Sequence, residues 1–226
     1  GAHTIVLGAG TYNLSIAGTI EEAALTGDLD ITADITIVGA DAATTIIDAK
    51  SLDRVFHVAG GAGRLTLSDV TITGGSVSGN GGGILVGTGA SQLTLTRVIV
   101  TGNTAGDGGG IFNNGTMFLT DVEISNNGDP ATAMGGGIHN RGVASLDRVT
   151  VNGNQAVDGG GIHNATPAAP ILLTNVTVSG NTASDKGGGL HAENSAIIVN
   201  STITQNTASN GGGIAENGWA SIIKNT

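Results

Sequence analysis

The chain has no cysteine, three prolines and five aromatic residues among its 226 positions. The absence of cysteine excludes a disulfide-stabilised scaffold, and the scarcity of proline excludes a collagen-like triple helix. No run of about 18 apolar residues is present, so we expect no membrane insertion of this segment. The net charge of −10 makes nucleic acid an unexpected partner, because an acidic chain repels phosphate backbones.

Glycine, by contrast, is in large excess, with 40 residues, where average usage is about 7%. Eighteen of these 40 form six Gly-Gly-Gly triplets, each followed by Ile or Leu. The triplets begin at Gly81, Gly108, Gly135, Gly159, Gly187 and Gly211. Their mean spacing is about 26 residues, and a period of this length predicts a protein whose repeats stack on one another.

Each repeat contains three short stretches of alternating apolar residues, which predict three strands. They are a Gly-Gly-Gly-Ile strand, a Leu-x-Leu strand such as residues 93–95, and a Val-x-Val strand such as residues 98–100. A helix would tolerate the triplets badly, at about 1 kcal/mol per glycine. We therefore predict an all-β fold, a right-handed parallel β-helix (β-solenoid). Dividing the chain length by the period of the triplets gives 8–9 coils of about 26 residues.

The first part of the chain lacks the triplet. We interpret residues 1–63 as irregular N-terminal capping coils and residues 64–226 as the regular Gly-Gly-Gly-Ile/Leu repeats of one continuous domain. One helical turn is expected at residues 19–25. Six strands are expected before the repeats, at residues 5–7, 12–14, 29–31, 35–38, 45–47 and 55–58. Residues 221–224 look like the start of a further strand, so we expect an open last coil that more chain or another subunit covers.

Asparagine recurs at two fixed positions of the repeat. Asparagine tolerates left-handed backbone at bends, and stacked asparagine side chains can hydrogen-bond from one strand layer to the next. Both positions are therefore predicted to form structural ladders. The first ladder comprises Asn103, Asn127, Asn154, Asn181 and Asn206, and the second comprises Asn113, Asn140 and Asn164.

The residue before the Val-x-Val strand alternates in charge through Asp69, Arg97, Asp121 and Arg148. With coils about 4.8 Å apart, these side chains are expected to form an exposed charge ladder with a structural role. The alternative is a carboxylate–arginine catalytic site of the polysaccharide lyase kind. That alternative lacks a clustered base and a nearby aromatic platform, so no catalytic residue is predicted.

The residue after the Ile or Leu of each triplet is expected to point outward. In three consecutive coils it is histidine, at His139, His163 and His191. Adjacent imidazoles can share a transition metal, but Phe112 fills the same position, so ring stacking is the simpler explanation. No cofactor is expected, apart from a candidate Ca²⁺ site in the acidic loop from Glu21 to Asp34.

Two parts of the sequence resemble known families. Residues 4–14, 26–32, 37–40 and 44–48 resemble the start of bacterial secreted right-handed parallel β-helix proteins, many of which carry a Cys-Ser-Leu-Arg-Glu-Ala segment that this sequence does not contain. The Gly-Gly-Gly-Ile-His/Phe-Asn repeats are similar to those of chlamydial polymorphic outer-membrane passenger domains. The resemblance implies an extracellular or cell-surface bacterial protein.

We therefore expect a non-enzymatic structural or adhesive β-helix: a rigid stalk, a surface passenger or a fibre subunit that polymerises end to end. Its expected partners are other copies of itself or the cell surface and matrix. One alternative is a polysaccharide lyase or glycoside hydrolase, which needs acid and base groups clustered across adjacent coils. The other is an ice-binding solenoid, whose contact face would consist of Thr-x-Thr pairs such as Thr71/Thr73.

Overall fold

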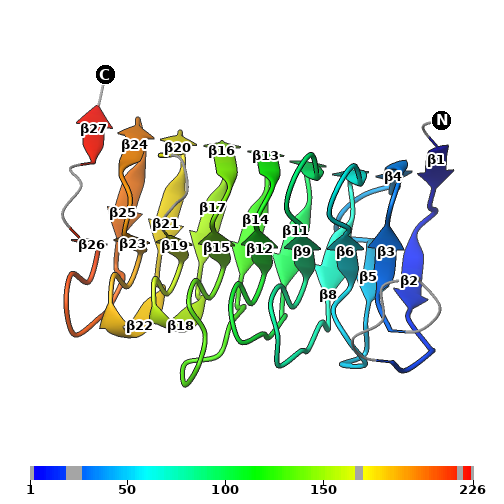
Figure 1. The fold of residues 1–226 in the computed structure, drawn as a ribbon, viewed down its shortest axis with the longest axis horizontal. Helices are drawn as coiled ribbons and strands as arrows, with labels where there is room; N and C mark the ends of the chain where they lie inside the picture. Colours follow the sequence, from blue (N-terminus) through cyan, green and yellow to red (C-terminus); the bar gives the residue numbers. More distant parts are fainter. Residues whose placement is uncertain (1–2, 19–26, 166–169, 218–220, 225–226) are drawn as a thin grey trace.

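The computed structural model describes residues 3–18, 27–165, 170–217 and 221–224. In this part of the chain all regular structure is strand, and the strands form parallel sheets. Figure 1 shows a stack of coils with the two chain termini at opposite ends. The predicted all-β, parallel β-helix fold is confirmed.

Three sheets run along the stack, and each coil contributes one strand to each of them. The first sheet contains β1 (His3–Val6), β4 (Asp34–Val38), β7 (Arg64–Ser68), β10 (Gln92–Thr96), β13 (Thr116–Thr120), β16 (Val143–Asp147), β20 (Ile171–Thr174), β24 (Ala196–Val199) and β27 (Ile222–Lys224). The second contains β2 (Gly10–Asn13), β5 (Thr45–Asp48), β8 (Thr71–Thr73), β11 (Ile99–Thr101), β14 (Glu123–Ser125), β17 (Thr150–Asn152), β21 (Thr177–Ser179) and β25 (Thr202–Thr204).

The third sheet carries the strands that follow the glycine triplets. It contains β3 (Leu29–Ile31), β6 (Phe56–Val58), β9 (Ile84–Val86), β12 (Ile111–Asn113), β15 (Ile138–Asn140), β19 (Ile162–Asn164), β23 (Leu190–Ala192) and β26 (Ile214–Glu216). A small additional sheet pairs β18 (Gln155–Asp158) with β22 (Thr182–Lys186). These two strands lie in the connections between the second and third sheets.

The stack makes about seven turns, slightly fewer than the predicted 8–9 coils. In the third sheet, the eight strands from β3 to β26 are separated by seven steps. Part of the difference arises at the N-terminal end, where the coils are longer than the mean period of the repeats. There β1 begins at His3, β4 at Asp34 and β7 at Arg64, and both of these intervals exceed every spacing between consecutive triplets.

Inward-facing aliphatic side chains form one continuous core along the stack. Leu65 and Leu67 of β7 pair in register with Leu93 and Leu95 of β10, and all four are at most 1% exposed. The alternation in the sequence produces this arrangement, because successive side chains of a strand point to opposite faces of the sheet. Burial of each such side chain contributes about 1.5–3 kcal/mol, so this shared core attracts neighbouring coils, whereas the hydrogen bonds between coils set their register.

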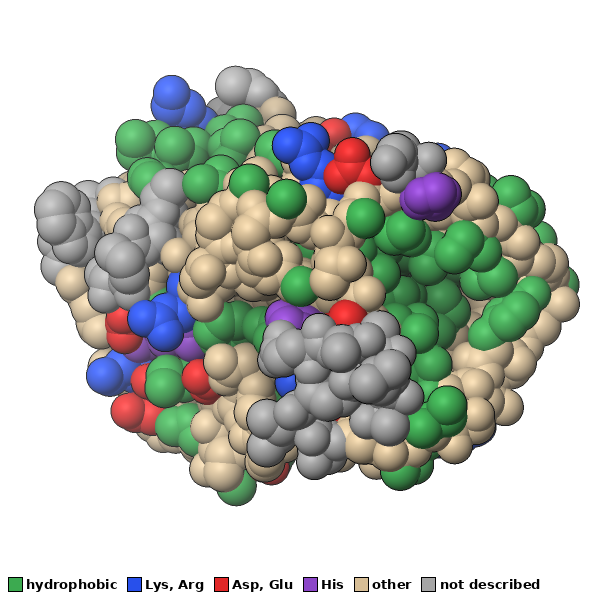
Figure 2. All heavy atoms as spheres, turned by 45° about the vertical axis from the view of Figure 1, so that its right-hand side comes forward, with side chains coloured by type: hydrophobic (Ala, Val, Ile, Leu, Met, Phe, Trp, Pro, Cys, Tyr) green, Lys and Arg blue, Asp and Glu red, His purple; other side chains and the backbone are tan. Residues whose placement is uncertain are grey.

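The first coils use the same sheets as the repeats, since β1, β4 and β7 are consecutive neighbours in the first sheet. Figure 2 turns this end of the stack forward and shows hydrophobic side chains gathered around a hollow. The hollow has a volume of about 210 Å³, and its lining includes Ile5, Leu7, Leu14 and Leu29.

The helical turn expected at residues 19–25 lies outside the described residues. Among the residues that are described, none forms a helix of the length and apolarity needed to cross a bilayer.

The glycine triplets mark places where the backbones of neighbouring coils approach closely. The first glycine of the triplet has left-handed backbone, with φ of 63° at Gly159. A Cβ atom added to the third, Gly161, would lie 2.7 Å from the carbonyl oxygen of Gly189 in the next coil. A side chain at either position would therefore force the coils apart or strain the turn.

We predict that Gly161→Ala lowers the free energy of unfolding by about 1–3 kcal/mol, as overpacking does elsewhere. Gly79→Ala is the matched control, because a Cβ at Gly79 would meet no atom within 4 Å. Urea denaturation followed by circular dichroism measures both variants. Equal stability of the two would contradict the close-approach role of the triplet.

Candidate functional site

The first asparagine ladder lies in the interior of the stack and joins consecutive coils. The Asn154 side-chain amide donates to Asn181 Oδ1 at 2.9 Å and to the Ile124 carbonyl at 3.0 Å. The backbone N–H of Asn154 also donates to Asn181 Oδ1, at 3.0 Å. The same pattern links the other members, in the order Asn103, Asn127, Asn154, Asn181 and Asn206. At the head of the ladder, where Gly75 replaces asparagine, the Gly75 N–H donates to Asn103 Oδ1 at 2.9 Å.

The second asparagine ladder is shorter and equally buried. The Asn113 side-chain amide donates to Asn140 Oδ1 at 2.7 Å, and that of Asn140 donates to Asn164 Oδ1 at 2.8 Å. All three side chains are fully buried. An unpaired buried amide costs about 1–3 kcal/mol, so each amide needs an acceptor in the adjacent coil. At the end of the ladder, where Ala192 replaces asparagine, the Asn164 amide donates to the Ser195 carbonyl at 3.2 Å.

Asn154→Ala is expected to lower the free energy of unfolding by about 2–4 kcal/mol, since it leaves the Asn127 N–H and the Ile124 carbonyl without their side-chain partner. Asn152→Ser is the control: Asn152 lies in register with Ser125 and Ser179 on the outer face of the second sheet, so this change should be nearly neutral. Guanidinium denaturation compares the two. A similar loss in both variants would show that the ladder bonds are not specifically stabilising.

The charge ladder consists of two separate ion pairs on the surface. Arg97 binds both carboxylate oxygens of Asp69, with contacts of 2.6 and 2.8 Å. Arg148 binds Asp121 in the same way, at 2.7 and 3.1 Å, and also contacts Asp147. Hydrogen bonds from the arginines hold the pKa of Asp69 and that of Asp121 below their usual range.

The same position has a backbone role that the sequence reasoning missed. All four residues of the charge ladder have left-handed backbone, with φ between 53° and 58°. Asn175 and Asn200, which follow at this position, have φ of 56° and 49°. The recurrence of Asp and Asn at this position could have indicated the left-handed backbone, because these residues tolerate it better than most. The two arginines at the same position interrupted that pattern.

The histidine column lies outside the main core, as expected for side chains that point outward from the sheet, but it does not reach solvent. His139, His163 and His191 are at most 3% exposed, and Phe112 in the same column is 1% exposed. The connections between the second and third sheets lie against the column, since His139 Nδ1 is 3.3 Å from the Met134 carbonyl and Asp158 lies beside His191. These connections contain small, buried alanines. These alanines are Ala105, Ala133, Ala156 and Ala183, each at most 3% exposed and none of them part of the main core.

The rings of this column stack at a constant spacing. The ring centroids of Phe112, His139, His163 and His191 are 4.8 Å apart at each step. The planes of His163 and His191 are nearly parallel, at 5°, whereas His139 and His163 meet at 62°. Burial lowers the pKa of His139 to about 4. Burial, together with the neighbouring imidazoles of His139 and His191, lowers that of His163 to about 4.

These pKa values predict a loss of stability in acid. Unfolded histidine has a pKa of about 6.5, so the unfolded chain binds more protons than the folded chain between pH 6.5 and pH 4. The contribution of the neutral histidines to the free energy of unfolding is therefore fully present above pH 6.5 and is lost as the pH falls toward 4. Asp28, whose folded pKa is raised to about 7, contributes with the opposite sign, and its contribution is lost as the pH rises through 7.

The variant His163→Phe isolates the histidine contribution, because Phe112 shows that the column accepts this ring. Between pH 7 and pH 4.5 its unfolding free energy should fall less than that of the wild type, by on the order of 2 kcal/mol. Denaturant titrations at the two pH values measure the difference. His3→Phe, on the exposed strand β1, should behave like the wild type. If the unfolding free energies of His163→Phe and the wild type fell by the same amount between the two pH values, His163 would not be a buried, neutral imidazole in the folded chain.

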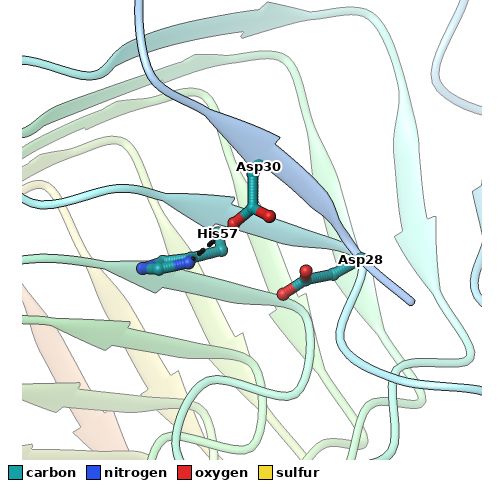
Figure 3. Close-up of side chains that lie close together, drawn as sticks. All are labelled: Asp28, Asp30 and His57. Atoms are coloured by element: carbon teal, nitrogen blue, oxygen red, sulfur yellow. Dashed lines mark hydrogen bonds and ion pairs between the residues drawn. The ribbon is translucent and has the colours of Figure 1, made fainter. Parts of the chain in front are cut away.

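The column continues beyond the repeats into the first coils. Asp30 of β3 pairs in register with His57 of β6, and His57 pairs with Leu85 of β9, which in turn pairs with Phe112. Figure 3 shows Asp28, Asp30 and His57 pointing toward one another. His57 Nδ1 lies 2.8 Å from Asp30 Oδ1. The sequence reasoning found both strands but did not align them with the repeats, because the first coils lack the glycine triplet.

These three residues are a candidate metal centre. Among the described residues they are the one group of three or more potential ligands whose ligand atoms all lie within 4.8 Å of one another. Asp28 and Asp30 fall in the predicted Ca²⁺ loop, whose residues 21–26 lie outside the described part. However, the Arg54 Nε atom is 2.6 Å from Asp28 Oδ2, so a guanidinium already supplies positive charge there.

The Asp28–Asp30–His57 cluster does not form a site that a polysaccharide can reach. The side chains of Asp28 and Asp30 are 4% and 1% exposed, and that of His57 is 9% exposed. Burial raises the pKa of Asp28 to about 7, opposed by the charge of Arg54 and reinforced by those of Asp30 and Asp53. The arrangement can hold charge and a proton inside the protein, whereas glycoside cleavage requires both carboxyl groups to meet the sugar.

The threonine face considered for ice binding is not a regular flat surface. Thr71 and Ser125 are buried, and Thr71 donates its hydroxyl hydrogen to the Ala42 carbonyl at 2.6 Å. Glu123, on the same strand as Ser125, is exposed on this face. The side chains therefore lack the even exposure that a repeated surface contact would need.

Comparison with known proteins identifies one of the repeats. Residues 175–193 match the Chlamydia polymorphic membrane protein repeat. They span β21, β22 and β23, and they include Asn181, the triplet that begins at Gly187, and His191. No curated protein and no solved structure matches the chain. The resemblance to chlamydial polymorphic membrane passenger domains is confirmed by this match together with the parallel β-helix fold.

Proposed function

Because the chain is a parallel β-helix with a repeat that matches the chlamydial polymorphic membrane protein repeat, we propose that it is a non-enzymatic, surface-displayed bacterial protein segment. It serves as a rigid stalk or adhesive passenger outside the cell. The repeat match carries this proposal, since the matched residues include the ladder asparagine Asn181 and the glycine triplet at Gly187 that build the coil.

The use of the polar side chains supports a mechanical role. The two asparagine ladders and the two arginine–aspartate pairs connect one coil with the next. Stacked parallel strands about 4.8 Å apart with a continuous core give a stiff rod that resists bending. The exposed side chains of the strands and connections then form the surface through which the rod contacts its partners. End-to-end polymerisation of such rods stays a prediction.

Surface labelling of the source bacterium tests the location. Antibodies raised against the folded chain should label intact cells, and protease added outside should remove the signal without lysis. Labelling that requires permeabilised cells would contradict surface display.

Adhesion tests the role. Beads coated with the folded chain should bind cultured host cells or extracellular matrix more than beads coated with an inert protein of similar negative charge. The charge-matched control matters because the net charge of −10 alone changes bead behaviour. Equal retention of the two kinds of bead would contradict an adhesive passenger.

A further inference from the structure

The outer face of the first sheet carries hydrophobic side chains that nothing in the chain covers fully. After Leu29, five large hydrophobic side chains are exposed among the described residues, and four of them belong to strands of this sheet. Three of the four point away from the core: Phe118, Val143 and Ile222 are 41%, 48% and 50% exposed. The strands that carry them run along one side of the stack (Figure 1).

A single column of side chains follows the middle of this face, and we call it the central column. Phe118 of β13 pairs in register with Ser145 of β16, which pairs with Leu172 of β20. Leu172 pairs in turn with Ile197 of β24, and both are half-buried. Toward the N-terminal end the column continues in threonines, namely Thr36, Thr66 and Thr94. The central column is therefore apolar in its C-terminal half and carries small hydroxyl side chains in its N-terminal half.

The outer faces of the other two sheets differ from this one. On the third sheet the outward rings, such as that of His163, are buried under the connections. On the second sheet the outward side chains of β17 and β21 are hydroxyl and amide groups, namely Thr150, Asn152, Thr177 and Ser179. The first sheet is thus the one whose exposed face is suited to hydrophobic contact.

The charge of this face also differs from that of the whole chain. The outward positions of its strands carry two acidic and two basic side chains, Asp34, Asp147, Arg64 and Lys224. The face is therefore neutral, whereas the chain has a net charge of −10. Two copies that meet through this face bring no net charge together, and the excess negative charge of each copy lies elsewhere on its surface.

We propose that two copies of this chain pack side by side through the outer faces of their first sheets, with the central column of one against that of the other. A two-fold axis parallel to the stack relates the copies, so each strand faces its own equivalent and both rods point the same way. Phe118, Leu172 and Ile197 then each meet the same residue of the second copy and form the apolar centre of the contact. This pairing suits two rods displayed on one surface, but it does not rest on the proposed adhesive role.

The area of the face is sufficient for a dimer. Nine strands about 4.8 Å apart, each up to five residues long at about 3.3 Å per residue, cover roughly 600 Å². Two such faces bury about 1,200 Å², which is the lower limit of stable, specific interfaces. Since the area is at this limit, we expect a Kd on the order of 10 μM.

Sedimentation equilibrium of the folded chain between about 1 and 100 μM measures the association. The expected result is a reversible equilibrium between monomer and dimer without larger species, because a two-fold contact is closed. The dimer should persist in about 0.5 M NaCl, since the face carries no net charge. End-to-end stacking would instead give a series of species that grows with concentration.

Matched variants locate the contact. Phe118→Lys and Leu172→Lys should each raise the Kd at least about tenfold, because they place a charge in the apolar centre. Thr150→Lys is the control: it makes the same change in charge on the outer face of the second sheet and should leave the Kd unchanged. Far-UV circular dichroism and the Tm of each variant show that it is folded.

Single introduced cysteines report the orientation of the two rods, because the chain has none of its own. A short bismaleimide should link Thr36→Cys to its equivalent, and likewise Ile197→Cys, since parallel rods bring every member of the central column to itself. Six strand steps separate these two positions, so antiparallel rods bring at most one of them to itself. Thr150→Cys is the control that should not be linked.

Four results would overturn the proposal. The first is a chain that stays monomeric over the whole concentration range, and the second is association that Phe118→Lys and Leu172→Lys leave unchanged. The third is cross-linking of Thr36→Cys and Ile197→Cys no greater than that of Thr150→Cys. The fourth is cross-linking at one of these two positions without the other, which contradicts parallel rods.

Discussion

The hydrogen bond between equivalent positions of adjacent coils is the interaction on which the rest of the structure depends. The buried backbone and asparagine groups of a coil find most of their partners in the adjacent coils, about 4.8 Å away. Asn154 illustrates the constraint, since its amide donates to Asn181 and to the Ile124 carbonyl while its oxygen accepts from Asn127. A slip of one residue in register would leave all of these groups unpaired and would turn the core side chains outward.

This constraint explains the composition. Gly161 is glycine because its backbone lies against that of Gly189 in the next coil, and proline is scarce because each coil donates backbone N–H groups to its neighbour. The connections then add a second buried layer outside the third sheet, which contains the histidine column and the buried alanines. The molecule therefore has a wide aliphatic core and a narrow aromatic and imidazole layer, separated by one sheet.

The sequence was sufficient for the fold because the same pattern recurs at a fixed period. The spacing of the triplets placed the strands, and the position of Asn103 and its equivalents placed the ladder. The burial of His163 was not predicted, because it depends on how a connection folds back rather than on strand alternation. The recurring alanine two residues after the ladder asparagine, as in Asn154 and Ala156, was the signal, since a connection exposed to solvent has no need of a small apolar residue there.

The first coils were harder to read because they lack the triplet that marks the register. Asp30 and His57 belong to the histidine column, yet their strands resemble ordinary alternating segments. Local sequence identifies strands, whereas the pairing between coils decides which side chains meet. The Asp28–Asp30–His57 cluster is a product of that pairing, and its charge is balanced by Arg54 from the connection before β6.

The most direct test of this account is hydrogen exchange of the asparagine side-chain amides, followed by nuclear magnetic resonance. If coil-to-coil bonds hold the stack in register, the Nδ2 protons of Asn127, Asn154 and Asn181 should exchange only through global unfolding, as slowly as the backbone amides of the core strands. Exchange of these protons as fast as those of the exposed Asn80 and Asn210 would contradict the account.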